Sequence, residues 1–486
     1  MSTAPPPAHT AAASASRTGP VLPLLLVSAF VVVLNETAMG VAIPQIMAGF
    51  DVSAASAQWL TTAFMLTMAV AIPITGVLLQ RFPLRSVFFA AMGLFAAGTL
   101  LAALAPGFGL LLLGRIVQAL GTSIILPLLF TTVMQLVAPE RRGRAMGLVT
   151  IVTAAAPALG PTVSGVIVSA LGWRWVFLLV LPVAALTLVA GAVWLRTATP
   201  TRPARFDALS VLLSAVGFSG AIYGLASIGE TSGASGGVPA WIPLVVGVIS
   251  LAGLVLRQLA LRDTERVLLD VRVFAGRTFT IATLAIVIVS VALFGSLILL
   301  PLAIQQLLGE PPYVAGLMLL PGGILSGVLA PFVGMLFDRV GARALIVPGA
   351  VVVTAALAAF STLNVSTPIG LVIAMHLLLN VGTALMMTPL MTTALGSVRP
   401  ELYSHASAIV NTLQQVAGAA GVALFVTLFS VASGSESAGT ATGPSATEAL
   451  TAGVGTAFAV GAAISAVGIV LAVLLGPKGG RRRVTA

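Results

Sequence analysis

Apolar stretches long enough to cross a lipid bilayer recur along the whole chain of 486 residues. A transmembrane helix needs about 20 mostly apolar residues, and fourteen segments of this chain satisfy that requirement. The ten-residue alternation of a transmembrane β-barrel is absent. We therefore predict an all-α integral membrane protein with fourteen transmembrane helices. The predicted spans are 21–44, 57–80, 86–105, 109–136, 145–170, 174–195, 207–228, 241–258, 278–304, 313–336, 343–361, 366–392, 405–431 and 452–476.

Composition supports this fold class, because only 7% of the residues are charged. A soluble domain averages about 25% charged residues, so this chain cannot cover a globular surface with charge. Cysteine is absent, which excludes disulfides and cysteine-based metal or redox sites. Residues 1–19 are rich in Ala, Pro, Ser and Thr and are expected to form a disordered cytoplasmic tail. The apolar run after Arg17 lacks a convincing cleavage site, so it is interpreted as an uncleaved first span.

The basic residues follow the positive-inside rule. If the N-terminus is cytoplasmic, all Lys and Arg residues except Arg115 and Arg174 fall in cytoplasmic loops or tails. The net charge of +10 therefore reflects membrane topology, and nucleic acid is not an expected partner. We expect a multi-pass protein of the inner (plasma) membrane with both termini in the cytoplasm.

Two stretches that lie 258 residues apart align without a gap, PITGVLLQRFPLR at 73–85 and PFVGMLFDRVGAR at 331–343. Each closes the second span of a group of six and enters a short cytoplasmic loop. A weaker echo pairs GTSIILPL at 121–128 with GTALMMTPL at 382–390, one residue out of register. The chain therefore divides into six, two and six spans, with two pseudo-symmetric six-helix halves. The identical positions are Pro73/Pro331, Gly76/Gly334, Leu78/Leu336, Arg81/Arg339 and Arg85/Arg343.

These repeats define the predicted domain organisation. In transporters built from parallel repeats, the substrate site lies between the halves near the bilayer midplane. The predicted units are the tail 1–19, the N-terminal six-helix half 20–196, two additional central helices at 197–258, a basic cytoplasmic connector at 259–277, the C-terminal six-helix half 278–476 and a basic cytoplasmic tail at 477–486.

The loop stretch GVLLQRFPLR at 76–85 resembles the signature G-x-L-a-D-r-x-G-r-k of the major facilitator superfamily. With the fourteen-span plan, nearly the whole chain is similar to the drug:proton antiporter family of bacterial multidrug exporters. The first copy has Gln80 where the family has Asp, whereas the second copy keeps Asp338. Ordinary positive-inside charge is the alternative interpretation of the arginines. The residues that the resemblance assigns to loop gating are Gly76, Arg81, Arg85, Gly334, Asp338, Arg339 and Arg343.

An asparagine and a glutamate interrupt the first apolar run, in the stretch LNETAMGVAIP at 34–44. It resembles the first-span motif l-D-x-T-i-v-n-v-A-l-P, with Asn35 in place of Asp, and lincomycin-resistance-type exporters have a similar N-E-T version. The carboxylate of Glu36 is therefore displaced by one position, and Thr37 and Pro44 complete the motif. Glu36 is the only carboxylate that we place well within a span.

The stretch LGRIVQALG at 113–121 resembles the fourth-span motif R-x-x-Q-G-x-G and contains Arg115 and Gln118. The resemblance implies that Arg115 takes part in proton transfer, and snorkelling to the outer interface is the alternative. By helical rise, Glu36 and Arg115 lie about 12 and 9 Å inside the outer ends of their spans. They are candidates for a pair that opens on protonation or substrate arrival, or for a static structural pair.

The stretch AAAPALGPTVSGV at 154–166 resembles the fifth-span antiporter motif g-x-x-x-G-P-x-x-G-G through Pro157, Gly160, Pro161 and Gly165. Proline removes a backbone hydrogen bond and small residues permit close helix packing. A merely packed helix also uses small residues. The paired Gly-Pro at this spacing nevertheless marks exporters within the superfamily.

Polar and soft side chains in several spans are candidates for the lining of a substrate cavity. Spacings of three and four residues place them on shared helical faces, and methionine suits an adaptable apolar pocket. Bonding between neighbouring helices is the alternative. No further ligands cluster with His376, so neither a metal site nor a catalytic site is predicted. The candidates are Gln118, His376, Asn380, Met387, Asn411, Gln414 and Gln415.

The resemblance implies proton-coupled efflux of hydrophobic, cationic small molecules or antibiotics by alternating access, with Glu36 attracting the cation or carrying the proton. The energy source is the proton gradient, and no cofactor is expected. The expected partners are protons, the small-molecule substrate and the lipid bilayer, and the protein is expected to be a monomer. A metabolite or nutrient carrier on the same scaffold is the first alternative, against which Gly160 and Pro161 argue. A membrane-embedded sensor or enzyme is the second, and no nucleophile constellation, phosphate loop or metal set supports it.

Overall fold

The computed structural model describes residues 21–475 except 53, 196–206, 230–238, 240, 262–263, 265, 311 and 434–443. Both predicted terminal tails and the basic residues at 196–206 lie outside the described residues, as does the side chain of Pro161. The described part is helical and contains no strand. The α-helices are α2 (Val21–Phe50), α3 (Ala54–Arg81), α4 (Leu84–Ala103), α5 (Phe108–Leu136), α6 (Arg142–Leu171), α7 (Trp175–Leu178), α8 (Val180–Trp194), α9 (Ala208–Gly229), α10 (Trp241–Ala260), α11 (Arg277–Gln306), α12 (Pro312–Val340), α13 (Arg343–Phe360), α14 (Ile369–Gly396), α15 (Tyr403–Ala432) and α17 (Pro444–Leu474).

These helices form because a bilayer offers no partner for backbone N–H and C=O groups, which must bond within the segment. Thirteen spans in the described part are long and apolar enough to cross a membrane, with α7 and α8 forming one of them. The 30-residue α6, packed between α2 and α12, adds the fourteenth. The fold is therefore the predicted fourteen-helix all-α membrane fold. Short 3-10 helices connect some of the spans, namely η1 (Pro139–Arg141), η2 (Val271–Ala275) and η3 (Pro400–Leu402).

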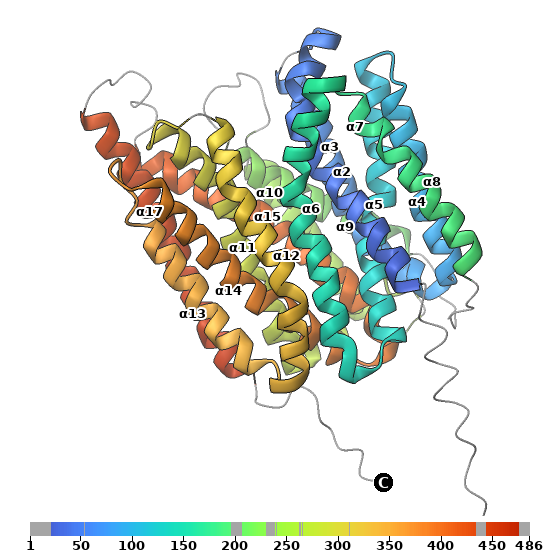
Figure 1. The fold of residues 1–486 in the computed structure, drawn as a ribbon. Coiled ribbons are helices and arrows are strands. Elements are labelled where there is room, and N and C mark those ends of the chain that lie inside the picture. The colour runs from blue at the N-terminus through green and yellow to red at the C-terminus, as the bar shows by residue number, and fades with distance from the viewer. Residues whose placement is uncertain are drawn as a thin grey trace, which may run out of the picture.

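Two groups of helices lie side by side, with α2–α8 in one half and α11–α17 in the other (Figure 1). The halves meet where α6 packs along α12 and where α3 packs along α15. In Figure 1, α6 and α12 approach each other at the lower end and diverge towards the upper end. We call the lower end the arginine-rich end, because it carries Arg81, Arg142, Arg339 and Arg343.

The two central helices α9 and α10 pair with each other, and α9 also packs against α3 and α15. They approach closely where Gly220 meets Gly247, because neither residue has a side chain. A side chain at Gly220 would lie 3.0 Å from the Gly247 Cα. At the ends of this pair, Arg257 Nε donates to Asp207 Oδ2 at 2.5 Å and Arg257 Nη2 donates to Asp207 Oδ1 at 2.7 Å. These hydrogen bonds, with two from Ser210, hold the pKa of the Asp207 carboxyl well below its usual range.

Most helix ends agree with the predicted spans, but several helices extend further. The first helix continues past Pro44 to Phe50, and α12 and α14 each extend four residues beyond the predicted span at the arginine-rich end. The predicted edges followed hydrophobicity, whereas a helix continues while its backbone hydrogen bonds are made and its next turn finds a surface to pack on.

Candidate functional site

A buried polar cluster joins α5 to α2 inside the N-terminal half. Gln118 Nε2 donates to Asn35 Oδ1 at 2.7 Å and to Thr99 Oγ1 at 2.8 Å. Arg115 Nη1 donates to Gln118 Oε1 at 2.6 Å and to Asn35 Oδ1 at 3.5 Å. These side chains lie away from both ends of the bundle, so each helix satisfies polar groups of its neighbour where lipid and water cannot.

The guanidinium of Arg115 lies on an aromatic face. Its Cζ lies 4.1 Å from the centroid of the Phe64 ring, and the residue is 1% exposed. Arg115 therefore does not snorkel to the interface, which was the alternative interpretation. Its Nε has no hydrogen-bond partner among the described residues. The cation is held by the ring of α3 and by the amide oxygens of Gln118 and Asn35.

Glu36 is not a direct ion-pair partner of Arg115, because the salt bridges between described residues join other side chains. Neighbouring residues of a helix point about 100° apart, so Asn35 faces α5 while Glu36 points elsewhere. Glu36 is half-buried, and Gly40 follows it one turn later on the same side with no atom within 4 Å of its Cβ position. The carboxylate therefore lies on the loosely packed side of α2, beside the cluster of Arg115.

The predicted antiporter motif on α6 fixes the position of this part of α2. A side chain at Gly160 would overlap Thr37 Oγ1 and lie 3.1 Å from the Leu34 carbonyl oxygen. One turn later Ser164 Oγ donates to the Ala38 carbonyl at 2.7 Å. The small residues of the motif thus let α6 lie against the polar turn that carries Asn35 and Glu36.

The other motif residues of α6 contribute less contact. Gly165 has only Val41 Cγ1 at 4.0 Å from its Cβ position. Pro157 is half-buried, and α6 runs past it as one helix. Close approach to α2 is therefore concentrated at Gly160.

At the arginine-rich end, the second copy of the loop motif joins the halves. Asp338, at the end of α12, accepts hydrogen bonds from the main-chain N–H groups of Gly143 and Arg144, each at 3.0 Å. Carboxylates are favoured at a helix N-terminus, where N–H groups are unpaired and the helix dipole is positive. A side chain at Gly143 would lie 2.6 Å from the Gly334 carbonyl oxygen, so both glycines are needed for this approach.

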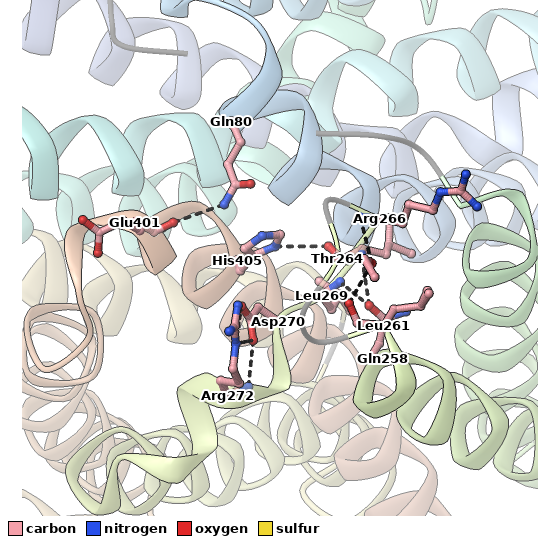
Figure 2. A network of polar contacts seen from close by, with 11 residues as sticks. Gln80, Gln258, Leu261, Thr264, Arg266, Leu269, Asp270, Arg272, Glu401 and His405 are labelled. Carbon is pink, nitrogen blue, oxygen red and sulfur yellow. Dashed lines mark hydrogen bonds and ion pairs between the residues drawn. The ribbon is translucent and has the colours of Figure 1, made fainter. Parts of the chain in front are cut away.

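The first copy makes a different contact. Gln80 Nε2 donates to the main-chain carbonyl of Glu401 at 3.1 Å, just before α15 (Figure 2). The replacement of Asp by Gln therefore exchanges a charged helix cap for a neutral hydrogen bond.

Two of the motif arginines contact their own half. Arg85 Nη2 donates to the Ala192 carbonyl of α8 at 3.4 Å, and Arg81 Cζ lies 5.6 Å from the Phe82 ring. Arg339 and Arg343 are exposed. An arginine that the sequence did not single out, Arg142, bridges the halves.

Arg142 Nη1 donates to the Tyr403 hydroxyl at 3.3 Å, while Nη2 donates to the Met134 carbonyl at 2.6 Å. Deeper in the interface, the hydroxyls of Thr150 and Thr388 lie 2.7 Å apart. The sequence signal for Arg142 was the run RRGR where the chain enters α6, but nothing in it distinguishes this arginine from its neighbours.

The connector after α10 is also attached at this end (Figure 2). Leu268 and Leu269 are buried, and their N–H groups donate to Gln258 Oε1 at 2.8 and 3.2 Å. His405 Nδ1 donates to the Leu268 carbonyl at 3.1 Å. Burial disfavours the ionised Asp270, but hydrogen bonds from Arg272 outweigh it and hold the pKa of that carboxyl below its usual value. The predicted basic connector is thus packed against α15.

The remaining cavity candidates fall into separate groups. In the C-terminal half, Asn380 bonds His376 and Ser326 between α14 and α12. Nearer the arginine-rich end, Gln414 Nε2 lies 4.0 Å from Met387 Sδ. Elsewhere on α15, Asn411 donates to the carbonyl of Ser407 one turn earlier at 2.8 Å, and Gln415 is half-buried. Gln118 belongs to the cluster of Arg115.

Comparison with known proteins agrees with this architecture. The Major Facilitator Superfamily model matches residues 25–422. The chain is 38% identical to the lincomycin resistance protein LmrB of Listeria monocytogenes, over 94% of this chain and 96% of that protein. It is 31% identical to a multidrug resistance protein B homologue of Mycobacterium tuberculosis, over 81% of this chain and 73% of that protein.

Among solved structures, the proton:xylose symporter XylE aligns with a TM-score of 0.63 and 14% identity, over 94% of this chain and 95% of that chain. This likeness concerns the fold. The family match and the relatives cover most of the chain and describe transporters rather than enzymes. The chain therefore belongs to the Major Facilitator Superfamily and is a multi-pass membrane transporter.

Proposed function

We propose that this transporter is a proton-coupled exporter of hydrophobic, cationic small molecules, antibiotics such as lincomycin among them. It would act in the plasma membrane with both termini in the cytoplasm, as a monomer and without a cofactor. The observation that carries the proposal is the half-buried carboxylate of Glu36, beside the Arg115 cluster in a chain related along most of its length to lincomycin resistance proteins.

A single carboxylate inside the N-terminal half is sufficient to exchange a proton for a substrate cation. Glu36 can be neutralised by a proton or by a substrate cation, and either one weakens the binding of the other. Such coupling is reciprocal, so a proton arriving from outside favours release of the cation and a cation arriving from the cytoplasm favours release of the proton. Arg115 interacts electrostatically with Glu36 and can bias this exchange, while the ion pairs between described residues do not include Glu36.

The contacts between the halves fit one state of an alternating-access cycle. The hydrogen bonds of Asp338, Arg142 and Thr150 across the interface all lie at or near the arginine-rich end. If that end faces the cytoplasm, this structure is the state closed to the cytoplasm. Loading substrate from the cytoplasm then requires these hydrogen bonds to break.

Purified protein in proteoliposomes tests the proposal. An imposed pH gradient should drive uphill movement of ethidium or lincomycin, and addition of either compound should move protons in the opposite direction. Glu36→Gln should abolish both responses, because glutamine keeps the size of the side chain but cannot ionise. Glu140→Gln is the matched control, since Glu140 is exposed in η1, and it should behave as wild type.

Coupled exchange of wild-type size by Glu36→Gln would remove Glu36 from the proton path. Absence of any response of the wild type to a pH gradient with both compounds would instead overturn the exporter proposal. It would favour a metabolite carrier on the same scaffold.

A further inference from the structure

The repeat that relates the two halves extends into their fourth helices. A side chain at Gly121 would lie 2.5 Å from the backbone N of Phe95, in α4. A side chain at Gly382 would lie 2.8 Å from the backbone N of Val353, in α13. Phe95 and Val353 are 258 residues apart, the same interval that relates the two loop motifs. Gly121 of α5 and Gly382 of α14 therefore occupy equivalent places.

This equivalence pairs Arg115 with His376. Each lies six residues before its glycine and is the eighth residue of its helix. Both are buried, at 1% and 8% exposure. Each half thus places one basic side chain at the same depth of its fourth helix.

The second spans of the two halves, α3 and α12, support the pairing of Arg115 with His376. The ring of Phe64 in α3 supports Arg115. The residue 258 positions later is Gly322 of α12, whose Cβ position lies 2.5 Å from His376 Nε2. The missing side chain at Gly322 makes room for the imidazole at the place where the other half holds a phenyl ring.

Hydrogen bonding leaves one imidazole nitrogen unused. Ser326 Oγ donates to Asn380 Oδ1 at 3.0 Å, which orients the amide so that Asn380 Nδ2 donates to His376 Nε2 at 3.1 Å. His376 therefore carries its proton on Nδ1, and a second proton binds at Nε2, where it replaces the hydrogen bond from Asn380 Nδ2. This atom is buried without a hydrogen-bond partner among the described residues, and the Leu319 carbonyl faces the ring without completing a hydrogen bond.

No other described titratable group lies near this imidazole on the helices that pack against α14. Those of α6, α11, α12, α13 and α15 all lie at the arginine-rich end, and the side chain of Tyr313 lies outside the described residues. They are Arg142, Arg144, Arg277, Asp338, Arg339, Arg343, Tyr403 and His405. A proton taken up by His376 is therefore opposed by no neighbouring cation.

We propose that His376 is a second proton-binding group, so that two protons enter for each monovalent cation that leaves. One proton is carried by Glu36 in the N-terminal half and one by the His376 imidazole in the C-terminal half. The imidazole binds a proton from outside and releases it to the cytoplasm. One net positive charge then moves inward per cycle, which makes transport electrogenic. This inference rests on the proposed antiport.

Ethidium transport in proteoliposomes with a clamped potassium diffusion potential tests it, because ethidium is a monovalent cation at every working pH. With one net charge per cycle, about 100 mV should change the ethidium gradient that wild type sustains about fiftyfold. His376→Gln should respond to the pH gradient alone and lose the voltage response. His405→Gln is the matched histidine control, and it should keep the wild-type charge per cycle.

Three outcomes decide the matter separately. A voltage response of His376→Gln equal to that of wild type overturns the role of His376. Electroneutral exchange by wild type overturns it as well, even if the variant does not fold. Failure of wild type to respond to any pH gradient rejects the antiport itself rather than the second site.

Discussion

Asp338 at the end of α12 and Gly143 at the start of α6 are joined by a hydrogen bond of 3.0 Å that crosses from one half of the protein to the other. The carboxylate caps a helix N-terminus, and the backbone of Arg144 supplies a second hydrogen bond. The equivalent position of the first repeat, Gln80, makes a single neutral hydrogen bond to Glu401. At these two equivalent positions the interface is therefore held unequally, by a charged helix cap at Asp338 and by a neutral hydrogen bond at Gln80.

This asymmetry predicts unequal effects of two matched substitutions. Asp338→Ala should make the interface open at least about tenfold more often, because hydrogen bonds to charged groups contribute ~1.5–3 kcal/mol. Gln80→Ala should raise the frequency of opening only about two- to tenfold, since a neutral hydrogen bond contributes ~0.5–1.5 kcal/mol. The native chain has no cysteine, so Thr388→Cys provides a single buried reporter in this interface. Because it also removes the hydroxyl that contacts Thr150, Thr388→Cys alone is the reference for both alanine variants.

The rate at which that cysteine reacts in inverted vesicles measures the opening. Equal rates for the two alanine variants would contradict the unequal interface. So would a larger effect of Gln80→Ala.

The close approach of α2 and α6 yields a second prediction. Gly160→Ala should lower the unfolding free energy by ~1–3 kcal/mol, because the added methyl overlaps Thr37 Oγ1 and one helix must move. Gly165→Ala should leave stability unchanged or slightly raised, since its Cβ position has only Val41 within 4 Å and alanine favours helix. Thermal unfolding in detergent provides the comparison.

The companion change Thr37→Ala should restore part of the stability lost in Gly160→Ala. A lack of any recovery would show that the overlap with Thr37 is not the cause. Equal loss in the two glycine variants would also argue against a specific contact.

The spans were predictable because the bilayer acts as a solvent with one strict demand. Every backbone polar group must bond inside its own segment, so hydrophobicity and length alone predict the helices. The close helix packing at Gly160 was likewise predictable from its motif, because only small residues allow helices to approach so closely. Hydrophobicity predicts that a segment crosses the membrane, but it does not predict the residue at which the helix ends.

The direction of single side chains was not predictable in the same way. Asn35 and Glu36 are adjacent and both polar, and only the packing of α2 against α5 decides that Asn35 faces Arg115. Arg142 has the same local chemistry as Arg141, and its contact with Tyr403 depends on the placement of two distant helices. The connector has the composition of a charged loop, yet Leu268 is buried in the structure. His405 of α15 donates a hydrogen bond to the Leu268 carbonyl and so attaches this part of the connector to the bundle.

The Arg115 cluster predicts that lysine cannot replace this arginine. A guanidinium can lie flat on Phe64 while Nη1 donates to Gln118 and Asn35, whereas an ammonium is a compact charge without a planar face. Arg115→Lys should slow ethidium efflux by at least about tenfold, since a lost charged hydrogen bond costs ~1.5–3 kcal/mol. Arg174→Lys is the matched control, because Arg174 also lies on an aromatic ring, 4.3 Å from that of Trp173, but is exposed.

Rates are compared at equal amounts of inserted protein, which separates transport from folding. Efflux at the wild-type rate by Arg115→Lys would mean that the planar arrangement is not required. A loss of equal size in Arg174→Lys would assign the effect to cation–ring contacts in general.

The arginine asymmetry predicts which side of the membrane each end of the bundle faces. Ser366 and Ser397 flank α14 at opposite ends, and both are exposed. The loop with Ser366 carries no basic residue, whereas Arg399 follows Ser397. Positive loops stay in the cytoplasm. Ser366→Cys should therefore react with an impermeant maleimide on intact cells, and Ser397→Cys only after permeabilisation. The reverse pattern would place the Asp338–Gly143 contact on the outside, and the structure would then be the state open to the cytoplasm.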